Sequence, residues 1–145
     1  MIPVQFPEHD FKIKIIQERE SIFDAMRKQW LVLTPEEWVR QNFLQYLIKS
    51  MAYPASLISV EREIALGDLR KRFDIVVYDR NGKPWMLVEC KAMDIPLDQY
   101  VLRQILNYNQ TLQVKYLMIT NGGYTKGFAL QPTAKEIDEM PFFMK

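Results

Sequence analysis

Four segments of the chain are rich in apolar and β-branched residues, have the length of β-strands and end at turn-forming residues. They are residues 57–64, 72–78, 84–90 and 114–120. The pair Asn81-Gly82 lies between the second and third segments and is typical of a hairpin turn. It predicts that these two strands are antiparallel neighbours.

Two other segments repeat apolar residues at helical spacing. The first begins at Thr34, a favoured N-cap residue, with Pro35 at the first helical position and Glu37 placed to complete a capping box. It is predicted to run to about Met51, and the second helix to span residues 96–113. The order helix, three strands, helix, strand predicts an α/β fold with an αβββαβ core. Its mixed sheet is flanked by helices, and the second helix connects a parallel pair of strands.

The two ends of the chain are less regular. Alternation from Phe11 to Ile15 is typical of a half-buried strand, and residues 1–33 are predicted to form an N-terminal β extension. Residues 34–145 are predicted to form one compact domain. It would end in a strand near residues 128–130 and a polar tail, helical or frayed.

Composition narrows the class of protein. A chain of 145 residues fits one domain with a substantial core, and a net charge of +1 means that any nucleic-acid surface must be local. With one cysteine and one histidine, the chain has no internal disulfide and no plausible structural zinc site. No signal-peptide pattern or bilayer-length apolar run is present, so we expect a soluble cytoplasmic protein without a membrane partner.

Ionisable residues occupy two of the predicted strands. Glu89 and Lys91 lie two residues apart and point to the same face of one strand, and Asp74 lies in the neighbouring strand. Ionised groups are costly to bury unless they are paired or bind a metal. Mg²⁺, or Mn²⁺, prefers oxygen ligands, which Asp74, Glu89 and the main-chain carbonyl of Cys90 would supply. With Lys91 beside the metal, this set predicts a magnesium-dependent nuclease.

The alternative interpretation is an exposed strand that carries a solvated Glu–Lys pair. The same spacing occurs at Asp10 and Lys12, where no apolar strand bearing an acid precedes it, so that pair is set aside. The hairpin context favours the metal site at Asp74 and Glu89.

Glu36 is a candidate third acid. Taking about 100° per residue, it falls in the middle of an apolar arc on the first helix. That arc is formed by Val39, Phe43, Tyr46 and Leu47. We expect Glu36 to lean over the sheet and contact a metal-bound water, and the alternative is a first-turn acid favoured by the helix dipole. The sequence does not decide whether Glu36 or Glu37 is the helix acid of the site.

Gln104 and Tyr108 lie four residues apart on one face of the second predicted helix. They are predicted to position the substrate phosphate or the acid cluster, although such a pair is also typical of the polar edge of an amphipathic helix. Four basic residues are candidate phosphate contacts, with ordinary solvated charge as the alternative: Lys71, Arg72, Arg103 and Lys126.

The motifs at residues 72–78, 87–91 and 104–108 together resemble the PD-(D/E)xK nuclease superfamily. Residues 34–41 and 116–122 extend the likeness, and the chain resembles most closely the N-terminal nuclease domain of type I restriction enzyme R (HsdR) subunits over about residues 34–123. The resemblance implies a restriction-endonuclease-like fold and Mg²⁺-dependent hydrolysis of DNA.

Site residues follow from the resemblance by position. It implies that Asp74 and Glu89 bind the metal, that Lys91 is the catalytic lysine, and that Glu36 is the helix acid. The pair Gln104 and Tyr108 resembles an accessory Gln-x-x-x-Tyr motif of some branches. Phe73 stands where the superfamily name has proline, while the catalytic positions are intact.

The chain has no Gly-x-x-x-x-Gly-Lys-Ser/Thr loop for ATP. We therefore expect a DNA endonuclease without the helicase-like motor of R subunits. It would act alone, as a homodimer, or with restriction-modification or DNA-repair partner proteins. The main alternative is a non-catalytic or partner-dependent DNA-binding or interaction module with a nuclease-like fold, and a third is an RNA or single-strand nuclease.

Overall fold

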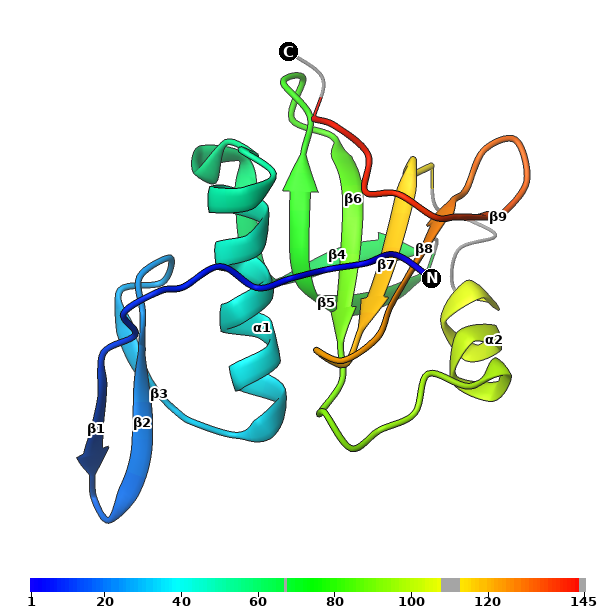
Figure 1. The fold of residues 1–145 in the computed structure, drawn as a ribbon. Coiled ribbons are helices and arrows are strands. Elements are labelled where there is room, and N and C mark those ends of the chain that lie inside the picture. The colour runs from blue at the N-terminus through cyan, green and yellow to red at the C-terminus, as the bar shows by residue number, and fades with distance from the viewer. Residues whose placement is uncertain (67, 108–112, 144–145) are drawn as a thin grey trace.

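The computed structural model of the protein describes residues 1–66, 68–107 and 113–143 (Figure 1). In chain order its elements are β1 (Ile13–Ile16), β2 (Arg19–Asp24), β3 (Gln29–Val32), α1 (Pro35–Gln45), the π-helix η1 (Tyr46–Ser50), the 3₁₀-helix η2 (Ala55–Leu57), β4 (Ile58–Leu66), β5 (Leu69–Tyr78), β6 (Pro84–Cys90), α2 (Gln99–Asn107), β7 (Tyr116–Thr120), β8 (Thr125–Ala129) and β9 (Lys135–Ile137).

The central sheet has the strand order β4-β5-β6-β7-β8-β9. The predicted hairpin joins β5 to β6, and Gly82 in its turn has the positive φ of 80° that glycine adopts readily. The helix α2 connects β6 to β7, which form the predicted parallel pair. The elements α1, β4–β6, α2 and β7 therefore confirm the αβββαβ core of a restriction-endonuclease-like fold.

The helices α1 and α2 pack on opposite faces of the central sheet (Figure 1). Val39 and Phe43 of α1 share a core with Ile75 and Val88, whereas Leu102 of α2 shares another with residues of the opposite face. The strand β6 lies between the two cores, and all of its residues after Pro84 are buried. The apolar sequence of β6 thus follows from its burial on both faces.

The first helix begins as predicted, but its last turn is a π-helix rather than an α-helix. The Thr34 hydroxyl accepts the main-chain N–H of Glu37 at 3.0 Å, so Thr34 is the N-cap. The α-helical part ends at Gln45 and continues as η1 to Ser50, close to the predicted end at Met51.

Two predictions for the C-terminal part need correction. The predicted helical or frayed tail instead contains the strand β9, whose residues 135–137 pair with β8. The strand predicted near residues 128–130 begins earlier, because Thr125 already pairs with Thr120 directly after the turn. The second helix spans Gln99–Asn107, and residues 108–112 of its predicted range lie outside the described part of the chain.

Residues 13–32 form a separate antiparallel sheet, β1-β2-β3. The preceding segment passes across α1 towards β8 (Figure 1). There the main-chain N–H of Ile2 donates to the carbonyl of Thr125 at 2.9 Å, and the Ile2 side chain is buried. In the described part of the chain, no helix is long and apolar enough to span a bilayer.

Candidate active site

The strands β5 and β6 separate at one end of their hairpin. Their ladder runs from Tyr78 opposite Pro84 to Ile75 opposite Val88. Beyond that point, the main-chain N–H of Cys90 donates to Asp74 Oδ2 at 2.8 Å. A side-chain carboxylate thus replaces a main-chain acceptor where the strands diverge. Asp74 directly precedes Ile75 and Glu89 directly follows Val88, so both acids lie next to the last pair of the ladder. We refer to this place as the fork.

Asp74 is largely buried at the fork, with 13% of its side chain exposed. Arg40 of α1 places Nη2 at 3.2 Å from Asp74 Oδ1. Burial raises the pKa of Asp74, although the Cys90 N–H and the Arg40 guanidinium both act to lower it. The ionised carboxylate is therefore only partly stabilised by its neighbours.

Glu89 is also buried and contacts a second internal cation. Lys71 of β5 places Nζ at 3.1 Å from Glu89 Oε1. Burial raises the pKa of Glu89; the Lys71 ammonium lowers it, and the charge of Asp74 raises it further. The ionised carboxylate of Asp74 is therefore close enough to oppose ionisation of Glu89. Lys71, a predicted phosphate contact, lies against this carboxylate.

Lys91 follows β6, and its main-chain N–H donates to the carbonyl of Thr120 on β7 at 2.8 Å. Burial raises the pKa of Glu36, Asp74 and Glu89, and the Lys91 ammonium is among the charges that lower it at all three. The structure therefore brings these four predicted site residues into one electrostatic cluster.

The two acids of the first helical turn differ in burial. Glu36 has 49% of its side chain exposed and lies 3.6 Å from Arg40 Nη2. Burial and then the charge of Asp74 raise its pKa, so it lies on the Asp74 side of α1. Glu37 is the buried acid, and its carboxylate contacts Arg27, Arg40 and Gln41. Of the two hydrogen bonds of the predicted capping box, the described contacts include the one from the Glu37 N–H to the Thr34 hydroxyl. The Glu37 carboxylate contacts other side chains rather than the Thr34 N–H.

Metal binding can be judged from the chemistry of these donors. The described residues contain no group of three or more His, Cys, Asp or Glu side chains arranged to hold a metal ion. Asp74 and Glu89 nevertheless offer hard carboxylate oxygens, and Glu89 Oε2 accepts no hydrogen bond from the described residues. Burial makes the ionised forms of both carboxylates costly. A bound divalent cation would offset that cost. These two residues fit Mg²⁺ or Mn²⁺, with the Cys90 carbonyl as the further predicted ligand.

The remaining predicted residues in the described part of the chain come from α2, β5 and β8. Gln104 is exposed on α2 and donates to the Tyr100 hydroxyl at 3.3 Å. Tyr108 lies outside the described residues. Arg103 and Lys126 line a shared hollow between α2 and β8, which also includes the acid Glu136. Arg72 is exposed on β5, on the same strand as Asp74.

Three charged residues near Asp74 were not predicted: Arg27, Arg40 and Glu61. For Arg40 a sequence signal exists, because it lies one helical turn after Glu36 and Glu37. No local pattern connects Arg27 or Glu61 with α1, since they come from a turn and a strand that are distant in sequence. Their contacts are consequences of tertiary packing.

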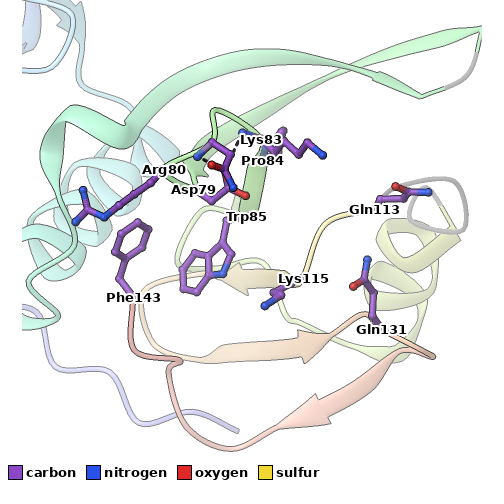
Figure 2. Close-up of a pocket in the computed structure, with 10 residues that line it drawn as sticks. Asp79, Arg80, Lys83, Pro84, Trp85, Gln113, Lys115, Gln131 and Phe143 are labelled. Atoms are coloured by element: carbon purple, nitrogen blue, oxygen red, sulfur yellow. Dashed lines mark hydrogen bonds between the residues drawn. The ribbon is translucent and has the colours of Figure 1, made fainter. Parts of the chain in front are cut away.

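A pocket of about 430 Å³ lies at the opposite end of the β5–β6 hairpin (Figure 2). Its walls include Lys83, Trp85, Lys115 and Phe143, with the Trp85 ring facing the pocket. It contains none of the predicted catalytic residues. The acid cluster is therefore separated from this pocket by the length of the paired strands.

Comparison with known proteins places the chain in a family. The family described as "Type I restriction enzyme R protein N terminus (HSDR_N)" matches residues 35–142. The chain belongs to this family. The match confirms the predicted resemblance and includes every element from α1 to β9, but it begins after the sheet β1-β2-β3.

The whole chain was also compared with solved structures and with curated proteins. The chain is similar to a crystal structure of a candidate nuclease belonging to DUF820 from Anabaena variabilis, with 15% sequence identity and a TM-score of 0.49. The alignment covers 85% of this chain and 79% of that chain. No curated protein matches the sequence.

Proposed function

We propose that the protein is a Mg²⁺-dependent DNA endonuclease of the PD-(D/E)xK type. The observation that carries this proposal is the cluster of Asp74, Glu89 and Lys91 at the fork of β5 and β6, in a chain of the type I restriction enzyme R N-terminal family. Hydrolysis of a phosphodiester places extra negative charge beside existing negative charge. A cleavage site must therefore combine metal ligands with positive charge.

Each residue then has a distinct task. Asp74, Glu89 and the Cys90 carbonyl hold the cation. When bound, Mg²⁺ supplies positive charge against the phosphate oxygens and favours ionisation of the attacking water. Lys91 orients that water or stabilises the charge that develops on the phosphate. Glu36, half-exposed at the rim of the cluster, accepts a hydrogen bond from water on the α1 side.

Binding of DNA requires a local basic surface, because the net charge of the protein is only +1. Arg72, Arg103 and Lys126 are proposed phosphate contacts, together with Lys71, which also pairs with Glu89. The limited positive charge favours cooperation with a restriction-modification or DNA-repair partner, or with a second copy of the chain. We place the protein in the cytoplasm, where its cysteine, an unpaired buried thiol, would stay reduced.

Nicking of supercoiled plasmid tests the assignment. We expect cleavage with Mg²⁺, none with EDTA, and a loss of about 10²–10³-fold in Lys91→Ala, the range for removal of one group that stabilises charge in the transition state. Lys83→Ala, an exposed lysine at the opposite end of β6, is the matched control and should cleave normally. Equal activity in Lys91→Ala and wild type would refute the catalytic role of Lys91.

A second candidate function is that of a DNA-binding or interaction module with a nuclease fold. One observation favours it: Asp74 and Glu89 already have the internal partners Arg40 and Lys71. Calorimetric titration with Mn²⁺ separates the two functions, because the enzyme must bind the metal at these acids. Binding that disappears in Glu89→Gln supports the nuclease, and no binding by the wild type supports the module.

A further inference from the structure

Arg40 on α1 is buried and lies among four carboxylates. Its Nη1 lies 2.9 Å from Glu61 Oε1 and 3.2 Å from Glu37 Oε1. Its Nη2 lies 3.2 Å from Asp74 Oδ1 and 3.6 Å from Glu36 Oε1. A planar guanidinium holds such partners at fixed relative positions, which a lysine ammonium does not. Arg40 therefore fixes Asp74 relative to α1 and β4.

Glu61 on β4 has an unusual backbone conformation, with φ of 52°. The pairing of β4 with β5 is interrupted at this residue, which lies opposite Asp74. A non-glycine residue in this conformation costs free energy and persists only where its surroundings fix it. Here the carboxylate is fixed by two arginines, with Oε1 bound to Arg40 at 2.9 Å and Oε2 bound to Arg27 at 3.0 Å.

Arg27 connects this cluster to the N-terminal sheet. It follows β2, and its Nε lies 2.7 Å from Oδ2 of Asp24, a fully buried residue at the end of that strand. The other oxygen of Asp24 accepts two main-chain N–H groups of the turn at 2.8 and 3.0 Å. An unbroken series of charged contacts thus runs through Asp24, Arg27, Glu61, Arg40 and Asp74. We refer to it as the ion-pair chain.

The ion-pair chain is a costly way to stabilise a fold. Asp24, Arg40 and Asp74 are largely buried, whereas Glu61 has 36% of its side chain exposed, and desolvation of the buried groups offsets much of their attraction to their partners. Arg40 Nε is also the one buried side-chain polar atom without a hydrogen-bond partner in the described part of the protein. A cluster with such costs is better explained by the geometry that it fixes, and the group at its end is Asp74.

We propose that Arg40 is a positioning residue for Asp74, and that Glu61 and Arg27 extend this role to the sheet β1-β2-β3. That sheet is then a part of the active site, although the family match begins only at residue 35. The inference rests on the proposed function, since it assigns the ion-pair chain to orientation of a metal ligand.

Substitution of the middle of the ion-pair chain tests this role, with the variants Arg27→Met and Glu61→Gln. Neither residue is a proposed metal ligand. Groups that orient metal ligands typically change metal affinity by about 10–100-fold when removed. We expect about tenfold weaker Mn²⁺ binding by calorimetry and a correspondingly higher Mg²⁺ requirement for plasmid nicking. The KM for DNA should not change, and Arg27→Lys should restore part of the metal affinity.

Glu63→Gln is the matched control, because Glu63 is an exposed acid on the same strand whose partner is the exposed Arg70 at 3.9 Å. It should retain wild-type metal affinity. Folding is checked by thermal denaturation, and Glu61→Gln, which keeps the side-chain shape, decides the outcome if Arg27→Met does not fold.

The inference would be overturned if folded Glu61→Gln had the Mn²⁺ affinity and the Mg²⁺ requirement of the wild type. This holds even if the variant is less stable than the wild type. That outcome leaves the nuclease assignment intact, because the wild type would still bind metal and cut DNA. If the wild type neither binds Mn²⁺ nor nicks plasmid, the proposed function fails and the inference fails with it.

Discussion

Asp74 and Glu89 each contact a cation of the protein itself, Arg40 at 3.2 Å and Lys71 at 3.1 Å. Burial nevertheless raises the pKa of both carboxyls, and the charge of Asp74 adds to the shift at Glu89. Their ionised forms are therefore incompletely stabilised. A divalent cation binds the ionised carboxylates. It must therefore compete with protons for these residues at low pH.

Stabilisation by metal should consequently depend on pH. A carboxyl whose pKa is raised in the folded protein favours folding when protonated, so these two groups make the metal-free protein less stable as pH rises through the folded pKa. Metal binding requires the ionised forms and is strongest above that pKa. We expect Mg²⁺ to raise the unfolding temperature more at about pH 8 than at about pH 5.

Thermal denaturation with and without Mg²⁺ measures this difference. At a free concentration of about 100 times Kd, the metal should add about 2.7 kcal/mol to the free energy of unfolding. Glu89→Gln serves as the control and should lose most of the Mg²⁺ effect at both values of pH. Equal shifts for the wild type at the two values would contradict the predicted competition with protons.

At the scale of residues, the acids were easier to predict than their partners. Asp74, Glu89 and Lys91 follow from alternation along strands, which is a local property of the sequence. The contacts of Arg40 and Lys71 with these acids depend on how α1 packs on the sheet and on where β5 leaves β6. No local pattern contains that information.

At the scale of elements, α1 carries both Glu36 and Arg40 and thus sets the α1 side of the acid cluster. Its start is fixed by Thr34, whose hydroxyl accepts the Glu37 N–H at 3.0 Å. Pro35, the next residue, has the backbone angle that a first helical position needs.

Loss of the Thr34 cap should destabilise the protein by a measurable amount. Thr34→Ala removes the hydroxyl acceptor and should lower the free energy of unfolding by about 1 kcal/mol. Thr34→Ser keeps the acceptor and should stay close to wild type. Urea denaturation of both variants provides the comparison, and identical midpoints for Ala and Ser would show that the cap contributes nothing.

Elements with strong local signals were predicted closely. The Asn81-Gly82 turn and the strand β6 are examples, since turn chemistry and a buried apolar run are both visible in the sequence. The strand β9 was missed because it has three residues, two of them charged. Its conformation is imposed by pairing with β8 rather than by its own composition.

At the scale of the whole molecule, the start of the chain completes the core of the central sheet. Ile2 packs into the core on the α1 side, next to Gly127 of β8 and Met118 of β7. A Cβ atom on Gly127 would lie 2.6 Å from Ile2 Cδ1 and 2.7 Å from Met118 Sδ. A side chain at this position would therefore have to displace the ends of the Ile2 and Met118 side chains.

Gly127→Ala should force the ends of the Ile2 and Met118 side chains to move. Overpacking of this kind typically costs about 1–3 kcal/mol, which urea denaturation can detect. Gly123→Ala is the control, because a Cβ there would meet no atom closer than Asn121 Oδ1 at 3.7 Å. If both variants unfold at the same urea concentration, the N-terminal segment is not packed tightly on β8.

The proposed function requires a divalent-metal site at the fork of β5 and β6. The most direct measurement is anomalous diffraction from a crystal of the protein soaked in Mn²⁺. We expect a Mn²⁺ peak between the carboxylates of Asp74 and Glu89, within coordination distance of both. A well-ordered structure without such a peak, or with Mn²⁺ bound elsewhere and Arg40 and Lys71 still paired with these acids, would contradict it.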